Sequence, residues 1–220
     1  DENVFNYVPA FRTELKDNLK IRDLVVHASG LRDWLPFYLF ADVRVSESPL
    51  TTVLRVIAED PPVRSNISEV IYSDLNFISL GILVADESHQ PLSQTFEEIV
   101  GRKLRLDSTL FAPANHERNR VAASEFGNYY EKVTCGKMGY FDMDDRDWKV
   151  AHSAGFDPWE YRWRDYPIWG EVHDGNAYFM GGAAGHAGLF STAEEVFKIA
   201  QQFLPNYTRL LKPETCELFR

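Results

Sequence analysis

The chain has 220 residues, 45% of them hydrophobic and 14% aromatic, so it can bury a substantial core and intrinsic disorder is not expected. Its formal net charge of −10 argues against nucleic acid or an anionic membrane surface as a partner, because both need a surplus of Lys and Arg. No apolar run approaches the roughly 20 residues of a membrane-spanning helix. Length and composition therefore favour one large domain or two small ones.

Helical periodicity dominates the first half of the chain. The apolar spacing predicts helices around residues 21–30, from Pro49 to Pro61, from Asp74 onward, and between Pro91 and Gly101. Proline suits the first turn of a helix, and glycine suits a helix end. Together these segments form a predicted helical region over about residues 15–110.

The helical pattern gives way from Arg102 to about Gly182 to glycine, aspartate, asparagine and aromatic residues. We expect a long loop excursion there, packed by its own side chains. Loops of that length inside a compact domain are usually functional, although an insertion without a chemical role is the alternative. Convincing strands are few, and only residues 42–48 alternate weakly.

Helical periodicity returns at about residues 192–204. Ser191 and Glu194 form an S-x-x-E capping box, which is a specific signal for a helix start. The residues expected to form its buried stripe are Val196, Ile199, Ala200 and Phe203. A short helix after Pro213 completes the predicted elements.

The stretch VIYSDLNFISLGILV, residues 70–84, places polar residues at the mouth of an apolar helix. In the simpler interpretation Asp74 is an N-cap and Tyr72 is a partly buried aromatic residue. In the functional interpretation a lysine ammonium near Tyr72 makes its phenolate easier to reach. Tyr72 could then take a proton from a serine hydroxyl during acyl transfer, while Asp74 orients the lysine or the substrate.

Histidines elsewhere have two interpretations as well. His27 lies at a predicted helix end, where a histidine is most often a structural hydrogen-bonding group. His173, Asp174 and His186 lie in a glycine-rich segment and could be imagined as metal ligands, although their spacing matches no metal signature. A metal-dependent hydrolase therefore stays open as an alternative.

Five segments in order resemble the β-lactamase-like, penicillin-binding-type serine hydrolases, specifically the class C and esterase branch. They are IRDLVVHASGL, YSDLNFISLGILV, PLSQTFEEIVGRKLRLDSTLF, AGHAGLFSTAEEVFKIAQQFL and LLKPETCELF, and the order and approximate spacing agree from about Tyr7 to Phe219. The resemblance implies an α+β fold in which an antiparallel sheet is flanked by helices. It implies that residues 1–220 are the central portion of a single domain, mainly helical, with long loops and little sheet.

The resemblance also shows what this chain lacks. The family nucleophile is a serine in S-x-x-K, but Lys16 and Lys137 are preceded by Thr13 and Thr134. The third family box is K-T-G or H-x-G on a strand. The segment His186–Gly188 imitates it but is expected to lead into a capped helix, so we reject that assignment. Nucleophile and third box are expected outside this chain, and the isolated 220 residues are expected to be inactive.

Roles within the chain follow from the same resemblance. Tyr72 matches the catalytic tyrosine and would be a general base or proton relay, while Asp74, in place of the commoner asparagine, would support it. The hydroxyl of Tyr72 must then open onto a cleft. Position and composition suggest that Trp34, Tyr129 and Trp169, with Glu125, shape a pocket for the acyl group.

The expected substrate is a small ester, β-lactam or D-amino-acid peptide, with no cofactor, no metal and no nucleic-acid partner. A bacterial periplasmic or secreted location is slightly favoured by the resemblance. The alternative from another class is a degenerate family member that has lost its nucleophile and acts as a binding domain.

Overall fold

The computed structural model describes residues 2–14, 16–41, 46–63, 70–113, 115–140, 163–217 and 219. Its α-helices are α1 (Ile21–Val25), α2 (Pro49–Glu59), α3 (Asp74–Ser88), α4 (Leu92–Phe96), α5 (Arg102–Leu104), α6 (Tyr129–Lys137), α7 (Gly175–Phe179), α8 (Ala193–Ala200) and α9 (Pro213–Glu217). Short 3-10 turns lie at Val4–Asn6, Pro9–Phe11, Phe37–Leu39, Asn115–Arg120 and Gln201–Phe203, and a π-helical turn lies at Glu97–Gly101. The weakly alternating stretch at 42–48 lies mostly outside the described residues.

Sheet is scarce in the described part of the chain. Strand β1 (Leu110–Phe111) pairs antiparallel with β2 (Leu189–Phe190), and Leu110 faces Phe190 in the register. The prediction of a mainly helical part of an α+β fold with little sheet is confirmed. Among the described residues, no helix combines the length and the apolar composition needed to cross a bilayer.

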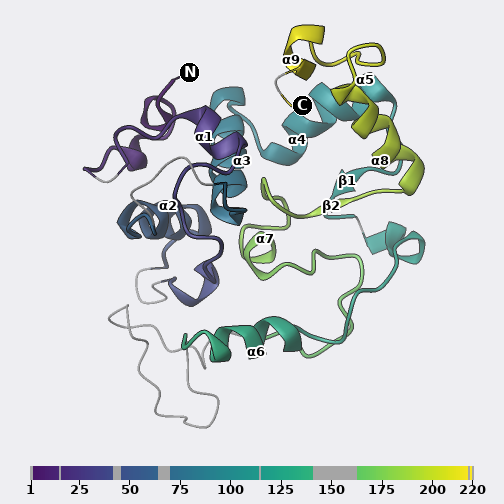
Figure 1. Cartoon of the computed structure of the whole chain (residues 1–220). Helices are drawn as coiled ribbons and strands as arrows, with labels where there is room; N and C mark the ends of the chain where they lie inside the picture. Colours follow the sequence, from purple (N-terminus) through teal and green to yellow (C-terminus); the bar gives the residue numbers. More distant parts are fainter. Residues whose placement is uncertain are drawn as a thin grey trace.

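The main core surrounds α3, which Figure 1 shows between α1 and α2 on one side and β1, β2 and α8 on the other. Leu75 and Ile78 of α3 are fully buried, as are the side chains that meet them in this core, Val4, Phe11, Leu24, Val53 and Ile57. Burying side chains of this size contributes about 1.5–3 kcal/mol each. The start of α3, which carries Tyr72 and Asp74, is therefore held on a well-packed helix.

Helix α2 begins where its sequence signals predict. The hydroxyl of Ser48 accepts the backbone N–H of Thr51 at 3.1 Å, and Pro49 is the first helical residue. At the other end, the buried ammonium of Lys16 donates to the carbonyl of Ala58 at 3.0 Å and to that of Asp60 at 2.7 Å. Lys16 therefore satisfies carbonyls that a helix C-terminus leaves without partners.

Replacing Lys16 by methionine keeps most of the side-chain volume but removes every donor. We expect Lys16→Met to lower the free energy of unfolding by about 1–3 kcal/mol, because two carbonyls lose their partner. Urea denaturation of the chain measures this, with Lys103→Met on exposed α5 as the matched control. Equal stability of Lys16→Met and the control variant would show that water replaces the ammonium without loss.

Two predicted helix ends are wrong. α1 stops at Val25, well before Gly30, because His27 adopts a positive φ of 56° and turns the chain. The fourth predicted helix passes through Gly101 in a π-helical turn and continues through α5 until Arg105 takes a φ of 55°. Glycine weakens a helix interior but does not end it unless the backbone turns there.

The capping signal at α8 is displaced by one residue. Thr192, not Ser191, is the N-cap, and its hydroxyl accepts the N–H of Glu195 at 3.3 Å. The carboxylate of Glu195 accepts the N–H of Asp107 at 2.9 Å and the hydroxyl of Thr109 at 2.5 Å. Glu195 thus ties α8 to the segment before β1.

The buried stripe predicted for the helix at 192–204 is wrong. Val196 is 52% exposed and Phe203 is 43% exposed, Ala200 is also exposed, and only Ile199 is partly buried. The buried positions in this stretch are instead the polar Glu195 and Gln202. Apolar spacing therefore found the helix but not the face that packs within this chain.

The stretch from 102 to 182 contains α6 and α7, which its composition did not predict. Buried Arg164 holds this stretch together: its Nε donates to Asn128 at 2.7 Å, its Nη1 donates to the carbonyl of Val172 at 2.6 Å, and its Nη2 donates to the carbonyl of His173. Asn128 in turn donates to Glu131 at 3.0 Å. The expectation of a long excursion packed by its own side chains stays a prediction, because residues 141–162 lie outside the described residues.

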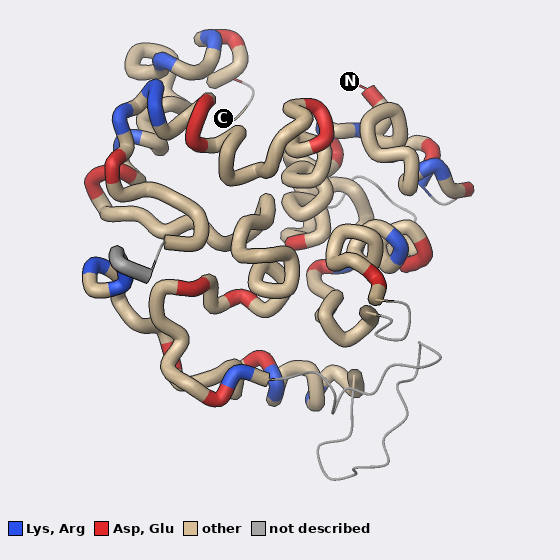
Figure 2. Tube along the Cα trace, turned by 180° about the vertical axis from the view of Figure 1, so that it is seen from behind, with Lys and Arg blue, Asp and Glu red and all other residues tan. Residues whose placement is uncertain are grey.

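Charge is mixed along the described chain. Figure 2 shows Lys and Arg beside Asp and Glu on α6 and around α5 and α8. Nucleic-acid binding requires a basic stripe on one face or along one helix, and these elements do not carry one.

Candidate active site

The turn before α3 is built by two crossing segments. Nδ1 of His27 accepts the backbone N–H of Ser73 at 3.1 Å, and the hydroxyl of Ser73 donates to the carbonyl of Arg32 at 2.6 Å. The N–H of Asp74 donates to the carbonyl of Asp33 at 2.8 Å. The stretch from His27 to Asp33 therefore fixes the backbone on which Tyr72 and Asp74 stand.

His27 has the structural role expected of it. Its Nδ1 is an acceptor for Ser73 and lies 3.1 Å from Nδ2 of buried Asn76, so the ring proton lies on Nε2. Its ring centroid lies 4.8 Å from that of Tyr72 and 5.0 Å from that of Phe77. His27 thus supports the Tyr72 ring from one side.

The N-cap of α3 is Ser73, and Asp74 is the first helical residue. The simpler interpretation of Asp74 as the N-cap is therefore wrong. Because Ser73 stands at the cap position, the carboxylate of Asp74 is left to face the pocket beside it. Acidic side chains in a first helical turn are favoured by the positive end of the helix dipole.

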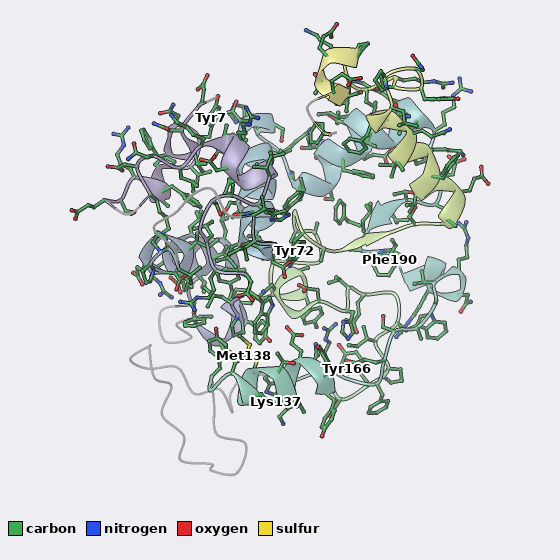
Figure 3. All side chains as sticks on the ribbon, viewed as in Figure 1. Tyr7, Tyr72, Lys137, Met138, Tyr166 and Phe190 are labelled. Carbon is green, nitrogen blue, oxygen red and sulfur yellow. The ribbon has the colours of Figure 1, made fainter. Side chains whose placement is uncertain are left out.

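A pocket of about 460 Å³ opens at this helix start. Its lining residues are Asp33, Trp34, Tyr72, Asp74, Tyr130, Glu131, Thr134, Met138, His173 and Asp174. Tyr72 is 67% exposed, so its hydroxyl does open onto a hollow, as its predicted role requires. Figure 3 places Tyr72 near the middle of the molecule, beside α7.

Of the predicted site residues, Tyr72, Asp74 and Trp34 come together in this pocket. Tyr129 and Trp169 do not line the pocket: Tyr129 is largely exposed, and Trp169 donates its indole N–H to the carbonyl of Val121 at 2.6 Å. Their predicted contact with substrate gains no support here. Glu125 does not line the pocket itself, but its Oε1 lies 2.8 Å from Nε2 of His173, which does.

Several lining residues were not predicted. Tyr130, Thr134 and Met138 stand four residues apart and so share one face of α6 and its C-terminal end. That spacing was a usable signal, but the polar composition of residues 129–137 concealed the helix. Asp33 and Glu131 had no signal of their own, because only the folded chain brings them to Tyr72.

The pocket is negatively charged. Asp33, Asp74, Glu131 and Asp174 line it, whereas no Lys or Arg does in the part of the chain that the structure describes. Burial raises the pKa of the Glu131 carboxyl, although the hydroxyl of Tyr38 donates to it at 2.8 Å. A cation brought into this pocket would be strongly attracted.

The phenol of Tyr72 responds to these charges. Partial burial raises its pKa above the ordinary value, and hydrogen bonding and charge from Asp74, with the charge of Asp174, raise it further. Within this chain the phenolate is therefore harder to form than in water. Proton abstraction by Tyr72 needs a cation that the described residues do not supply.

The pKa values of the Asp74 and Asp174 carboxyl groups are shifted in opposite directions. Burial raises the pKa of Asp74, and the charge of His186 only partly opposes this. Burial also acts to raise the pKa of Asp174, but the hydrogen bond and charge of His186, with the N–H groups of Ala177 and Asn176, lower it overall. The surroundings therefore favour the ionised form of Asp174 and disfavour that of Asp74.

His186 lies behind this pair. Its side chain is only 3% exposed, and its Nε2 lies 3.0 Å from Oδ1 of Asp174. The segment His186–Gly188 leads into strand β2, so the expectation that it precedes a helix directly is wrong. Even so, His186 is a buried partner of Asp174 and does not present its ring at an open strand edge.

Asp74, Asp174 and His186 are close enough to share a metal ion, since one potential ligand atom from each lies within 4.8 Å of the others. The ligands considered from the sequence were His173, Asp174 and His186, but His173 pairs with Glu125 and Asp74 takes its place in this cluster. A histidine that ligates a metal usually anchors its other ring nitrogen on an acceptor. In His186 the anchored nitrogen is Nε2, on Asp174, and Nδ1 is buried without a partner among the described residues.

Comparison with known proteins gives the family. The family model named Beta-lactamase matches residues 1–218, so the chain belongs to the beta-lactamase family, a family of serine hydrolases. An Escherichia coli (strain K12) protein named "Putative D-alanyl-D-alanine carboxypeptidase" is 29% identical over 234 residues, which cover 100% of this chain and 48% of that protein. The chain spans about half the length of the curated relatives it matches.

Solved structures show the fold. The hydrolase EstCE1, described as having promiscuous acyltransferase activity, superposes with a TM-score of 0.58 at 19% identity, over 99% of this chain and 55% of that one. A class C beta-lactamase from Rhodobacter sphaeroides gives a TM-score of 0.58 at 16% identity, over 98% of this chain and 47% of that one. The predicted family and fold class are confirmed.

Proposed function

We propose that residues 1–220 are the central portion of a single serine hydrolase domain that works by acyl transfer. The observation that carries this proposal is the exposed hydroxyl of Tyr72 at the mouth of the 460 Å³ pocket, beside Asp74 and on the rigid start of α3. The names of the similar proteins support a carbonyl substrate, namely a D-amino-acid peptide, an ester or a β-lactam.

In the proposed reaction Tyr72 moves one proton. It takes the proton of a serine hydroxyl as the serine oxygen bonds to the substrate carbonyl carbon. It returns the proton to the leaving group as the bond between that carbon and the leaving group breaks. Water then releases the acyl group from the serine by the same proton transfers.

The serine comes from outside these 220 residues, because the chain contains no S-x-x-K. The lysine of that motif would supply the cation that the Tyr72 phenolate needs. Asp74 supports the lysine, and Trp34 forms part of the wall against which the acyl group packs. Tyr129 and Trp169 stay predictions for substrate contact without support from the pocket.

Labelling with a fluorescent penicillin tests whether the nucleophile lies outside the 220-residue chain. We expect the full-length protein to become covalently labelled and the 220-residue chain to stay unlabelled on a denaturing gel. The reason is that the chain holds the proton-transfer tyrosine but neither nucleophile nor oxyanion hole. Burst labelling of the chain alone would contradict the proposal, as would a full-length protein that has no serine in an S-x-x-K motif.

A further inference from the structure

We propose that His186 is a positioning residue for proton transfer at Tyr72: by donating its Nε2–H to Asp174 from behind, it fixes that carboxylate and partly offsets its field at the Tyr72 hydroxyl. This inference rests on the proposed function, because it names a control element of the same site. His186 itself does not line the pocket and does not touch the phenol.

Two hydrogen bonds fix the carboxylate of Asp174. Its Oδ1 accepts the N–H of Ala177 at 2.7 Å, which caps α7, and it accepts Nε2–H of His186 at 3.0 Å. Both donors stabilise the ionised carboxylate and fix its direction. Asp174 is therefore a fixed charge at the pocket wall rather than a mobile one.

His186 is buried and has a single hydrogen-bond partner among the described residues. The ring is 3% exposed, and Nε2 is its engaged nitrogen, while Nδ1 has no partner among the described residues. All the hydrogen bonding seen for this side chain thus goes into Asp174. A histidine placed only to fill space could be replaced by an apolar ring, whereas this one also donates a hydrogen bond to a partly buried carboxylate.

The backbone around His186 shows how the chain holds it there. A Cβ atom on Gly185 would lie 1.9 Å from the carbonyl oxygen of Phe77, and one on Gly81 would lie 2.7 Å from the N of Gly185. The loop therefore crosses α3 with backbone against backbone. This close approach sets His186 one residue beyond the crossing, behind the start of the helix that carries Asp74.

The charges that face Tyr72 come from each neighbouring element. They are Asp74 on α3, Asp174 at the N-cap of α7, His27 and Asp33 on the crossing segment, and Glu131 and His173 across the pocket. Both Asp74 and Asp174 raise the pKa of Tyr72, and His186 acts on both carboxyl groups. His186 acts on these two carboxyl groups although it does not line the pocket.

Two substitutions then have opposite expected effects. His186→Phe removes the N–H that partly offsets the field of the Asp174 carboxylate, so the phenol should titrate at higher pH. Asp174→Asn removes the charge but keeps an oxygen acceptor and a good N-cap, so the phenol should titrate at lower pH. We expect each shift to be about half a pH unit or more. A merely structural disturbance would not reverse sign between the two.

The titration is measured in the 220-residue chain. The tyrosines carry a difluorinated label, and the fluorine NMR signal that disappears in Tyr72→Phe identifies position 72. His186→Gln, which keeps an amide N–H, should titrate nearer to the unsubstituted chain than His186→Phe does. His89→Asn, on the exposed and left-handed end of α3, is the control and should leave the titration of Tyr72 unchanged.

Opposite shifts in His186→Phe and Asp174→Asn support the proposal, and shifts of the same sign, or no shift in folded variants, overturn it. If His186→Phe does not fold, Asp174→Asn decides, and an unchanged or higher titration of Tyr72 overturns the proposal. In the full-length protein the acid limb of the pH profile of kcat/KM should move in the same two directions, and an unmoved profile also overturns it. Failure of the proposed function is a separate result, seen as full turnover by Tyr72→Phe.

Discussion

Tyr72→Phe in the full-length protein should lower kcat/KM for an activated ester by about 10²–10⁴-fold, the range expected when one proton-transfer group is removed. The substitution keeps the ring that lies 4.8 Å from His27 and removes only the hydroxyl. The pocket should therefore keep its shape while serine attack loses its proton acceptor. Steady-state kinetics with a p-nitrophenyl ester, and the rate of penicillin labelling, measure the loss.

The control for this experiment is Tyr207→Phe, since Tyr207 is also exposed but lies in the segment after α8. It should turn over ester at the rate of the unsubstituted protein. Thermal melting should show both variants within about 0.5 kcal/mol of the unsubstituted protein, because exposed hydroxyls contribute little to stability. Unchanged ester and β-lactam turnover in Tyr72→Phe would remove Tyr72 from the mechanism.

The sequence correctly predicted a helix start where the residues that set it are adjacent in the chain. Ser48 and Pro49 open α2 as expected, because an N-cap hydroxyl and a first-turn proline act on their own backbone. α6 was missed because its buried residues are Glu131 and Cys135, whose partner is Tyr38, nearly a hundred residues earlier in the chain. A helix held by polar tertiary contacts has little periodic signal.

In the candidate site too, some residues were predicted from the sequence and others became evident only in the folded chain. Tyr72 and Asp74 were predicted from the resemblance of their segment to the family, and Trp34 from position and composition; the structure adds that all three line one pocket. Asp174 and His186 were noticed only as imagined metal ligands, since nothing in their spacing reveals that they lie behind Asp74. Their role depends on the crossing of a glycine-rich loop over α3, which is a property of the folded chain.

That crossing makes Gly185→Ala the substitution with the largest expected effect on stability. The added Cβ would lie 1.9 Å from the carbonyl oxygen of Phe77 and 2.9 Å from the N of Gly81, and both are backbone atoms of α3. Neither can turn away as a side chain could, so the loop must lift from the helix. We expect the free energy of unfolding to fall by roughly 2–4 kcal/mol.

Urea denaturation of the chain measures this loss, and Gly101→Ala is the matched control. A Cβ on Gly101 would meet only the carboxylate end of Glu97, a flexible side chain, and Gly101 lies in a helical turn. Alanine there should be neutral or stabilise by up to about 1 kcal/mol. Because His186 follows Gly185, lifting the loop should also displace His186 from Asp174 and move the Tyr72 titration upward. Gly185→Ala with the stability of the unsubstituted chain would mean that the loop does not lie against α3, and the placement of His186 behind Asp174 would fail with it.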